Sequence, residues 1–295
     1  MGIPFLQILA SIINEIAVSV LTYQPTTKGT FSVYAKYGDL KSNTLNLMVL
    51  GDSPFKQKVL VEDYTGTWCG WCPRLAKAIE MVEAQTVNMV PVAIHCSSGL
   101  AYDPFNFSDK NILFNAFDIS AFPTATINRT EKWEFPEDTP GGVYQVVKKL
   151  QNKALLGVGI SSALSNGELK IDIEVGFLID QTDLKLVVYL LEDKLPYTQV
   201  NYTSLYGGTS SIPNFEHNHV LRYCLTDLLG DAIPAADSKA DRTYQKAFSF
   251  SVAGSNLSNS ANIRLVAFVV NGTSKNAINV EEAKVNETVG IQIPF

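Results

Sequence analysis

Apolar and polar residues alternate over two short segments near the start of the chain, residues 30–35 and 44–49. Alternation with a period of two predicts β-strands that turn one face toward a core. The turn-forming residues Tyr37, Gly38 and Asp39 lie between the two segments, which therefore predict a hairpin. We expect a short N-terminal β segment over residues 1–54.

The pattern changes between residues 55 and 154, where apolar strand-like runs alternate with helical spacing such as Leu75, Ile79 and Val82. The predicted order β-α-β-α-β-β-α is typical of a thioredoxin-like layer fold, which we expect over residues 55–154. The strands are expected at residues 58–64, 87–95, 124–128 and 132–135, and the helices from residue 74 onward and at residues 111–117 and 143–150.

Beyond residue 154 the helical signals disappear, and seven short apolar or alternating runs are separated by turn residues. Such a series predicts a β-sandwich over residues 155–295. The expected fold class is therefore α/β plus all-β, with a central thioredoxin-like domain between two β parts. The runs lie at residues 156–162, 169–177, 184–191, 220–225, 247–252, 263–270 and 277–285.

The chain has 295 residues and a formal charge of −6, with no cluster of basic residues. This argues against nucleic acid or an anionic membrane surface as a partner. The first 20 residues are apolar, but no Lys or Arg precedes Lys28, and Asn14 and Glu15 interrupt the run. The segment is therefore a poor signal peptide and too broken to span a bilayer, so no transmembrane helix is expected.

Four cysteines occur, two of them in the motif Trp68-Cys69-Gly70-Trp71-Cys72-Pro73 between a predicted strand and a predicted helix. Two cysteines at this spacing can close a small ring, and the helix N-terminus stabilises the first sulfur as a thiolate. The thiolate attacks disulfides, so the motif predicts a redox-active pair that needs no cofactor. Cys96 and Cys224 either form a bridge or remain separate buried thiols.

A thiol exchanger also needs a groove for the backbone of its partner. Pro123, at the border of a predicted strand, is expected to be cis and to shape that groove together with Phe122 and Thr124. The alternative is an ordinary trans proline in a turn. Trp68, Gly70 and Trp71 would complete an apolar lip, although Trp68 could instead cap the core.

The chain has three histidines. His95 ends the second predicted strand of the thioredoxin-like domain, where it is either a modulator that lowers a thiolate pKa or a hydrogen-bonded structural residue. His217 and His219 are expected on one face of a strand. Two imidazoles can bind zinc, but no third or fourth ligand is evident, so we predict no metal site.

The motif and its surroundings resemble the thioredoxin superfamily and, more closely, the outer-membrane-protein-28-related family of Bacteroidetes. This resemblance implies a cell-envelope protein, in the periplasm or at the outer membrane surface, whose thioredoxin-like domain precedes an immunoglobulin-like sandwich. The N-terminal β segment would then be a partial immunoglobulin-like unit. The similar segments are residues 59–66, 69–73, 93–95, 122–129, 191–193, 199–202 and 217–222.

The resemblance also implies roles for individual residues. Cys69 would be the attacking thiol and the more exposed of the two, and Cys72 the resolving thiol one turn inside the helix. Asp63 occupies the place of a buried acid that accepts the proton of the resolving thiol through water. Glu62 points to the opposite face, and one of the two acids should be solvated. The alternative for Asp63 is a solvated residue near the strand end.

The predicted function is thiol-disulfide exchange with disulfide-bearing or dithiol proteins of the envelope. The rival prediction is a non-catalytic binding or adhesion protein of the outer membrane, in which the thioredoxin-like domain is a scaffold and Cys69–Cys72 a permanent disulfide. The sequence predicts no oligomeric state.

Overall fold

The structure is a computed structural model that describes residues 10–13, 16–18, 29–49, 52–134 and 140–291. The chain divides into two compact units, Met1–Ser53 and Pro54–Phe295. The division falls in a cluster of turn-forming residues, Gly-Asp-Ser-Pro, at positions 51–54. Over the described ranges, no helix is long and apolar enough to cross a membrane. The apolar stretch at residues 1–20 lies mostly outside those ranges.

The first unit is an antiparallel sheet. Its strand β3 pairs with β5, with Thr30 opposite Met48, and also with β4 across a turn in which Gly38 has a φ of 57°. The predicted hairpin is confirmed, while the immunoglobulin-like assignment stays a prediction. The strands are β1 (Ala10–Ile13), β2 (Ile16–Val18), β3 (Gly29–Tyr37), β4 (Leu40–Lys41) and β5 (Leu45–Val49).

The second unit begins with the predicted order β-α-β-α-β-β-α, and each element lies within a few residues of its expected position. The strand β6 pairs in parallel with β7 and antiparallel with β8. The elements are β6 (Val59–Thr65), α1 (Cys72–Glu83), β7 (Met89–His95), α2 (Lys110–Phe117), β8 (Thr124–Ile127), β9 (Glu131–Lys132) and α3 (Pro140–Val147), followed by the 3-10 turn η1 (Lys148–Gln151).

All seven strands predicted after residue 154 are present, and four more occur among the described residues: β13, β14, β16 and β20. The strand β14 is mostly polar and exposed, so its sequence lacks the alternation that predicts a strand. The strands are β10 (Leu156–Ser165), β11 (Glu168–Phe177), β12 (Leu184–Glu192), β13 (Leu195–Val200), β14 (Ser211–His217), β15 (Val220–Cys224), β16 (Asp231–Ile233), β17 (Thr243–Ser251), β18 (Ile263–Asn271), β19 (Ala277–Lys284) and β20 (Thr288–Val289), with the 3-10 turn η2 (Ser260–Asn262) before β18.

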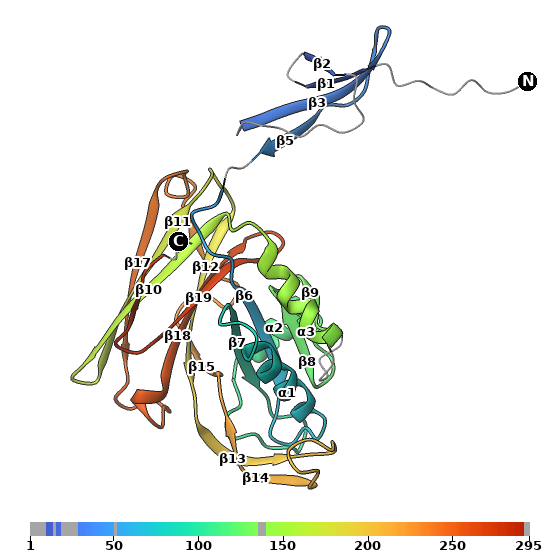
Figure 1. Ribbon diagram of the computed structural model, residues 1–295. Helices are drawn as coiled ribbons and strands as arrows, with labels where there is room; N and C mark the ends of the chain where they lie inside the picture. The colour runs from blue at the N-terminus through green and yellow to red at the C-terminus, as the bar shows by residue number, and fades with distance from the viewer. Residues whose placement is uncertain (1–9, 14–15, 19–28, 50–51, 135–139, 292–295) are drawn as a thin grey trace, which may run out of the picture. The chain divides into compact units, whose positions relative to one another are not determined.

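One nine-stranded sheet contains strands from both sides of residue 154, in the order β19-β18-β12-β15-β7-β6-β8-β9, with β16 paired to β12. The join is a parallel pair, Val220 opposite Ala93, in which the Ala93 N–H donates to the His219 carbonyl at 2.8 Å. The domain boundary expected between residues 154 and 155 stays a prediction, and the sheet continues across it (Figure 1).

The strands β12 and β18 are buried on both faces, which explains their nearly continuous apolar sequence. One face of β12, with Tyr189, packs against β6, β7 and α2. The other face, with Val188, packs against β10 and β11 of a second sheet, β17-β11-β10-β20. A third core lies between the other face of β6 and β7 and the helices α1 and α3. The protein is thus mostly β-sheet, built from several sheets.

Candidate functional site

The two cysteines of the motif form a disulfide in the turn that leads from β6 into α1. Cys69 and Cys72 are joined, with 5.4 Å between their Cα atoms. The helix begins at Cys72, and Pro73 occupies its first turn, where a missing N–H removes no helical hydrogen bond. The predicted ring therefore closes at the N-terminus of a helix.

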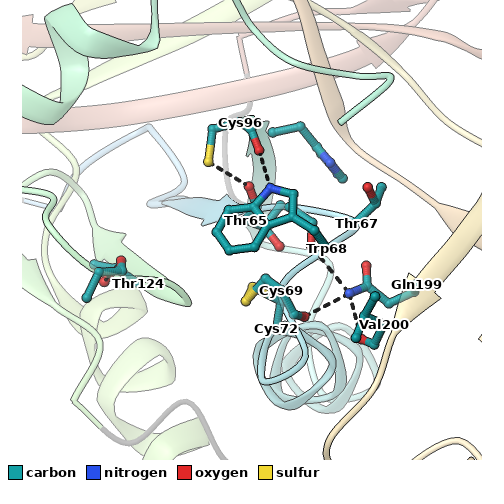
Figure 2. Close-up of a disulfide and its surroundings, with 12 residues drawn as sticks. Thr65, Thr67, Trp68, Cys69, Cys72, Cys96, Thr124, Gln199 and Val200 are labelled. Atoms are coloured by element: carbon teal, nitrogen blue, oxygen red, sulfur yellow. Dashed lines mark hydrogen bonds between the residues drawn. A yellow bond between two sulfur atoms is a disulfide. The ribbon is translucent and has the colours of Figure 1, made fainter. Parts of the chain in front are cut away.

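Both cysteines are buried, with 4 % of Cys69 and 3 % of Cys72 exposed. Cys69 is expected to be the more exposed of the two, but the difference is small and both residues are nearly closed to solvent. Residues 199–202, from the C-terminal half of the chain, contribute to the burial of the two cysteines. We call these residues the covering segment. The Gln199 side-chain Nε2 donates to the Cys69 carbonyl at 2.9 Å. Figure 2 shows Gln199 and Val200 on one side of the motif and Thr124 on the other.

The covering segment also holds the motif through backbone hydrogen bonds. The Val200 N–H donates to the Thr67 carbonyl at 2.9 Å, and the Tyr202 N–H donates to the Gly70 carbonyl at 2.7 Å. The Tyr202 ring leaves no room for a side chain at residue 70, because a Cβ there would lie 2.3 Å from Tyr202 Cδ2. Trp71 faces outward and is 50 % exposed, with its ring edge-on to Tyr202 at 6.1 Å between centroids.

On the other side of the motif the Phe122–Pro123 peptide bond is cis, as predicted. The Trp68 ring contacts the Phe122 ring at 5.8 Å between centroids, so the segment before Pro123 lies against the motif. Trp68 is half-buried, and its Nε1 donates to the Cys96 carbonyl at 2.7 Å. Trp68 therefore both forms the side of the site and anchors the loop to the end of β7. The Thr124 hydroxyl donates a hydrogen bond to the Ala121 carbonyl at 2.7 Å.

The remaining two cysteines are separate thiols, so the predicted alternative of a bridge between them is wrong. Cys96 is buried, its thiol donates to the Thr65 carbonyl at 3.3 Å, and burial raises its pKa to about 12. Cys224 is half-buried, and its thiol donates to the Thr226 carbonyl at 3.1 Å. Burial raises the pKa of both thiols, which disfavours the reactive thiolate form at each.

Asp63 and Glu62 face opposite sides of β6, as expected, but both are buried. The prediction that one of them is solvated is wrong because Glu62 has a buried counter-charge: Arg129 Nη2 lies 2.7 Å from Glu62 Oε1. Asp63 faces α1, and its Oδ1 has no hydrogen-bond partner among the described residues. Burial without a counter-charge raises the pKa of Asp63 to about 8, so it is largely protonated at neutral pH.

His95 is buried and hydrogen-bonded, its Nδ1 lying 3.0 Å from Asp103 Oδ2. The same carboxylate oxygen accepts the backbone N–H of Thr67, just before the motif, at 2.7 Å. Burial alone would raise the pKa of Asp103, but the hydrogen bonds from His95 and from the backbone of Thr67 and Phe105 hold it below its ordinary value. The hydrogen bond therefore agrees with the second of the two expected roles of His95, a hydrogen-bonded structural residue.

A cavity of about 100 Å³ lies next to the motif and collects groups that the sequence left apart. Asp63, Cys72 and all three histidines line it. His217 ends β14, whereas His219 has a left-handed backbone, with a φ of 58°, in the connection to β15. The prediction that both lie on one strand is wrong because the chain turns between them. Over the described ranges, no group of three or more ligating side chains is arranged to hold a metal ion.

Sequence reasoning missed three residues that hold the motif in place: Gln199, Tyr202 and Asp103. The first two lie in a segment that belongs to the resemblance noted above, but nothing in their sequence pattern indicates that they contact the motif. Asp103 lies in a loop and bonds both His95 and Thr67. These two residues are far apart in sequence, so no local pattern indicates that one carboxylate joins them.

The fold and the site define a mostly β protein that carries a disulfide at the start of a helix, beside a cis-proline. The model of the family described as outer membrane protein Omp28 matches residues 110–289, and the chain belongs to this family. This confirms the resemblance derived from sequence and the expected location at the periplasm or outer membrane surface. The match begins after the motif, so membership by itself says nothing about Cys69 and Cys72.

Two solved structures are similar to this chain. HBP35 of Porphyromonas gingivalis has a TM-score of 0.61 and 22% sequence identity, over 80% of this chain and 77% of that one. A domain of the outer membrane lipoprotein Omp28 from Porphyromonas gingivalis has a TM-score of 0.31 and 16% identity, over 45% of this chain and 89% of that one. The first likeness shows a shared fold. No curated protein matches the chain.

Proposed function

We propose that this chain is a thiol-disulfide exchange protein of the cell envelope. The observation that carries the proposal is the contact of Trp68, in the motif, with Phe122, the residue before cis-Pro123. It brings together a disulfide at a helix N-terminus and a proline that can order the backbone of a partner. Residues 55–154 then form a thioredoxin-like domain, supported by the element order of β6 to α3, and the later strands an immunoglobulin-like sandwich.

The exchange proceeds in two steps. The Cys69 thiolate attacks one sulfur of a partner disulfide, forming a mixed disulfide and releasing the first partner thiolate. The Cys72 thiolate then attacks the Cys69 sulfur, which closes the Cys69–Cys72 bond and releases the second partner thiolate. The partner gains two electrons and, once its thiolates are protonated, two protons. Run in reverse, the same steps oxidise a dithiol partner.

Asp63 has the properties of a proton acceptor for the resolving thiol. It lines the same cavity as Cys72, and its pKa of about 8 is close to that of an ordinary thiol. A group with such a pKa can take up the Cys72 proton when the thiolate is needed and return it when the bond opens.

The partner would dock across the motif and the segment before Pro123. The exposed ring of Trp71 and the exposed ring of Tyr202 lie edge-on at one border of the site. These aromatic side chains favour a polypeptide with apolar residues around its cysteines. Because both sulfurs are nearly closed to solvent, docking must displace part of this lip before Cys69 can react.

The test is to trap the mixed disulfide. Cys72→Ser leaves Cys69 without a resolving thiol, so partners should remain attached and be released by dithiothreitol. The matched control is Cys69→Ser/Cys72→Ser, which should capture nothing. Absence of any Cys69-dependent adduct from envelope extracts and from model disulfide peptides would remove the proposal.

A second candidate is a binding or adhesion protein in which the disulfide is structural. The observation that favours it is the burial of both sulfurs together with the hydrogen bonds from Gln199, Val200 and Tyr202. A redox titration against glutathione, followed by tryptophan fluorescence, separates the two candidates. A potential below about −300 mV supports the structural role, and a higher potential supports exchange.

A further inference from the structure

The cavity next to the motif lies on the side of the resolving sulfur, since its wall includes Cys72 but not Cys69. It extends from buried Asp63 to Glu80 and Glu83, which are exposed on α1. A buried water molecule needs about 10–15 Å³ of such volume. The cavity, at about 100 Å³, therefore has room for several water molecules.

Three polar atoms of residues that line this cavity have no hydrogen-bond partner within the described part of the chain: Asp63 Oδ1, His217 Nε2 and His219 Nδ1. His219 Nδ1 lies 3.7 Å from Asp193 Oδ1, whereas Asp63 and His217 belong to the interior and are only 5 % exposed. Buried polar atoms in folded proteins are nearly always hydrogen-bonded to protein or to water. Since both residues line a cavity with room for water, water molecules in this cavity can satisfy both atoms.

His217 is held in one orientation by three rings. His95, Phe105 and Phe215 contact it at centroid distances of 5.1, 5.3 and 5.0 Å. Its Nε2 has no hydrogen-bond partner within the described part of the chain, and in the tautomer that carries the proton on Nδ1 this atom accepts a hydrogen bond. Burial lowers the pKa of His217 to about 3, so the ring stays neutral at physiological pH.

Asp63 and His217 are complementary in this arrangement. Asp63 is largely protonated at neutral pH and donates, while neutral His217 accepts. Farther out, His219 Nε2 lies 3.2 Å from Glu83 Oε1, whose side chain is 39% exposed. The polar groups therefore continue from the protein interior to its surface.

We propose that this cavity is a hydrated proton path between Asp63 and solvent, and that His217 positions the water molecule next to Asp63. The proposal rests on the proposed exchange function and assigns a positioning residue to it. Reduction of the Cys69–Cys72 bond takes up two electrons and two protons from a dithiol and solvent. The proton for Cys72 passes from Asp63, which is reprotonated through the water, His219 and Glu83. His217 orients the water without being protonated itself.

The path crosses several elements, and other titratable groups face it besides Asp63 and His217. These are Cys72, Glu80 and Glu83 of α1, His95 of β7, Glu216 of β14 and His219 of the following turn.

The first test needs no exchange activity. The carboxyl carbon of Asp63 is followed by NMR from pH 5 to pH 10 in the wild type, His217→Phe and His217→Gln. His217→Phe should displace the water and raise the Asp63 titration midpoint by on the order of one pH unit, because desolvation disfavours the carboxylate. His217→Gln keeps an acceptor and should stay near the wild type, as should the control Tyr197→Phe in the same hairpin.

An Asp63 midpoint that is the same in wild type and His217→Phe overturns the proposal. Circular dichroism verifies that each variant is folded. If His217→Phe does not fold, His217→Leu removes the acceptor with a smaller side chain and decides in the same way.

The second test measures reduction of the disulfide by dithiothreitol in a single turnover, in H2O and D2O. His217→Phe should slow reduction on the order of tenfold and move the pH dependence that Asp63 imposes upward by about one pH unit, while His217→Gln restores both. Unchanged rates and pH profiles in His217→Phe overturn the proposal. A wild type that exchanges with no protein partner sinks the proposed function instead, and the NMR titration still decides the position of the water.

Discussion

The Tyr202 N–H donates a hydrogen bond to the Gly70 carbonyl at 2.7 Å, and the Tyr202 ring occupies the space beside the Gly70 Cα. Residue 70 stands between the two cysteines, whereas residue 202 belongs to the C-terminal half of the chain. The covering segment thus packs against the motif at a position, residue 70, where a side chain would overlap the Tyr202 ring as it lies here.

Gly70→Ala should therefore push Tyr202 away from the motif. A Cβ at residue 70 would lie 2.3 Å from Tyr202 Cδ2, and because the exposed Tyr202 ring can turn aside, the cost should lie at the lower end of the about 1–3 kcal/mol of unfolding free energy found for overpacked cores. Urea denaturation measures this loss. Reduction by dithiothreitol should become several-fold faster as the cover loosens.

A double-mutant cycle tests the cause of that effect. In a Tyr202→Ala background the added methyl group meets no ring, so Gly70→Ala should cost little, and the two changes should be strongly non-additive. The control is Gly290→Ala, where a Cβ meets nothing within 4 Å. Additive effects of the two changes would contradict the contact.

Asp63 should make the protein less stable as the pH rises. The folded state holds the Asp63 proton up to pH 8 or so, whereas the unfolded chain releases it near 3.8, so the unfolded state binds fewer protons between these values. The free energy of unfolding should fall by about 1.4 kcal/mol per pH unit in this window because of this one group.

Asp63→Asn removes this dependence. The difference in urea-unfolding free energy between the variant and the wild type should be constant below pH 4 and should increasingly favour the variant up to pH 8. Asp172→Asn, at an exposed position of β11, is the matched control. A difference between Asp63→Asn and wild type that does not change with pH would show that Asp63 is not buried as a protonated acid.

The ion pair of Glu62 and Arg129 should be sensitive to removal of one partner. Arg129→Met leaves the Glu62 carboxylate buried without a counter-charge, which costs about 3–5 kcal/mol of unfolding free energy. Changing both residues, as Glu62→Gln with Arg129→Met, should recover much of the loss. Chemical denaturation measures both variants.

The exposed pair of Lys239 and Asp180 provides the comparison, since breaking it by Lys239→Met should change stability little. Equal effects of Arg129→Met and Lys239→Met would contradict the burial of the Glu62 pair.

Asp103 should stabilise the loop before the motif. Asp103→Ala removes the acceptor of both the Thr67 N–H and His95, and each unsatisfied buried group costs about 1–3 kcal/mol. We expect a lower melting temperature and faster hydrogen exchange at the Thr67 amide, measured by NMR. Asp103→Asn keeps one acceptor oxygen and should lose less. Wild-type protection of the Thr67 amide in Asp103→Ala would rule out this contact.

Local patterns predicted much of the fold. The runs at residues 58–64 and 124–128 lie in buried strands, because such strands carry apolar sequence regardless of what covers them. The proline at a strand border next to a cysteine motif was enough to predict the cis bond of Pro123. These features depend on neighbours in sequence.

The features that the sequence did not predict arise where distant residues decide the environment. Cys69 is covered by Gln199, 130 positions away, and Glu62 is neutralised by Arg129, 67 positions away. No local pattern in β6 distinguishes a solvated acid from one with a buried partner. The strand β14 was missed because its exposed polar residues carry no period, although it brings His217 to the cavity.

The parallel pairing of β15 with β7 limits which part of the chain can be recombined with other proteins. The backbone N–H of Ala93 in β7 is bonded to the carbonyl of His219. If the part of the chain that carries the cysteines were transferred alone, one edge of β7 would lose its neighbouring strand. Recombination that keeps this sheet intact must therefore transfer Pro54–Phe295 as one unit.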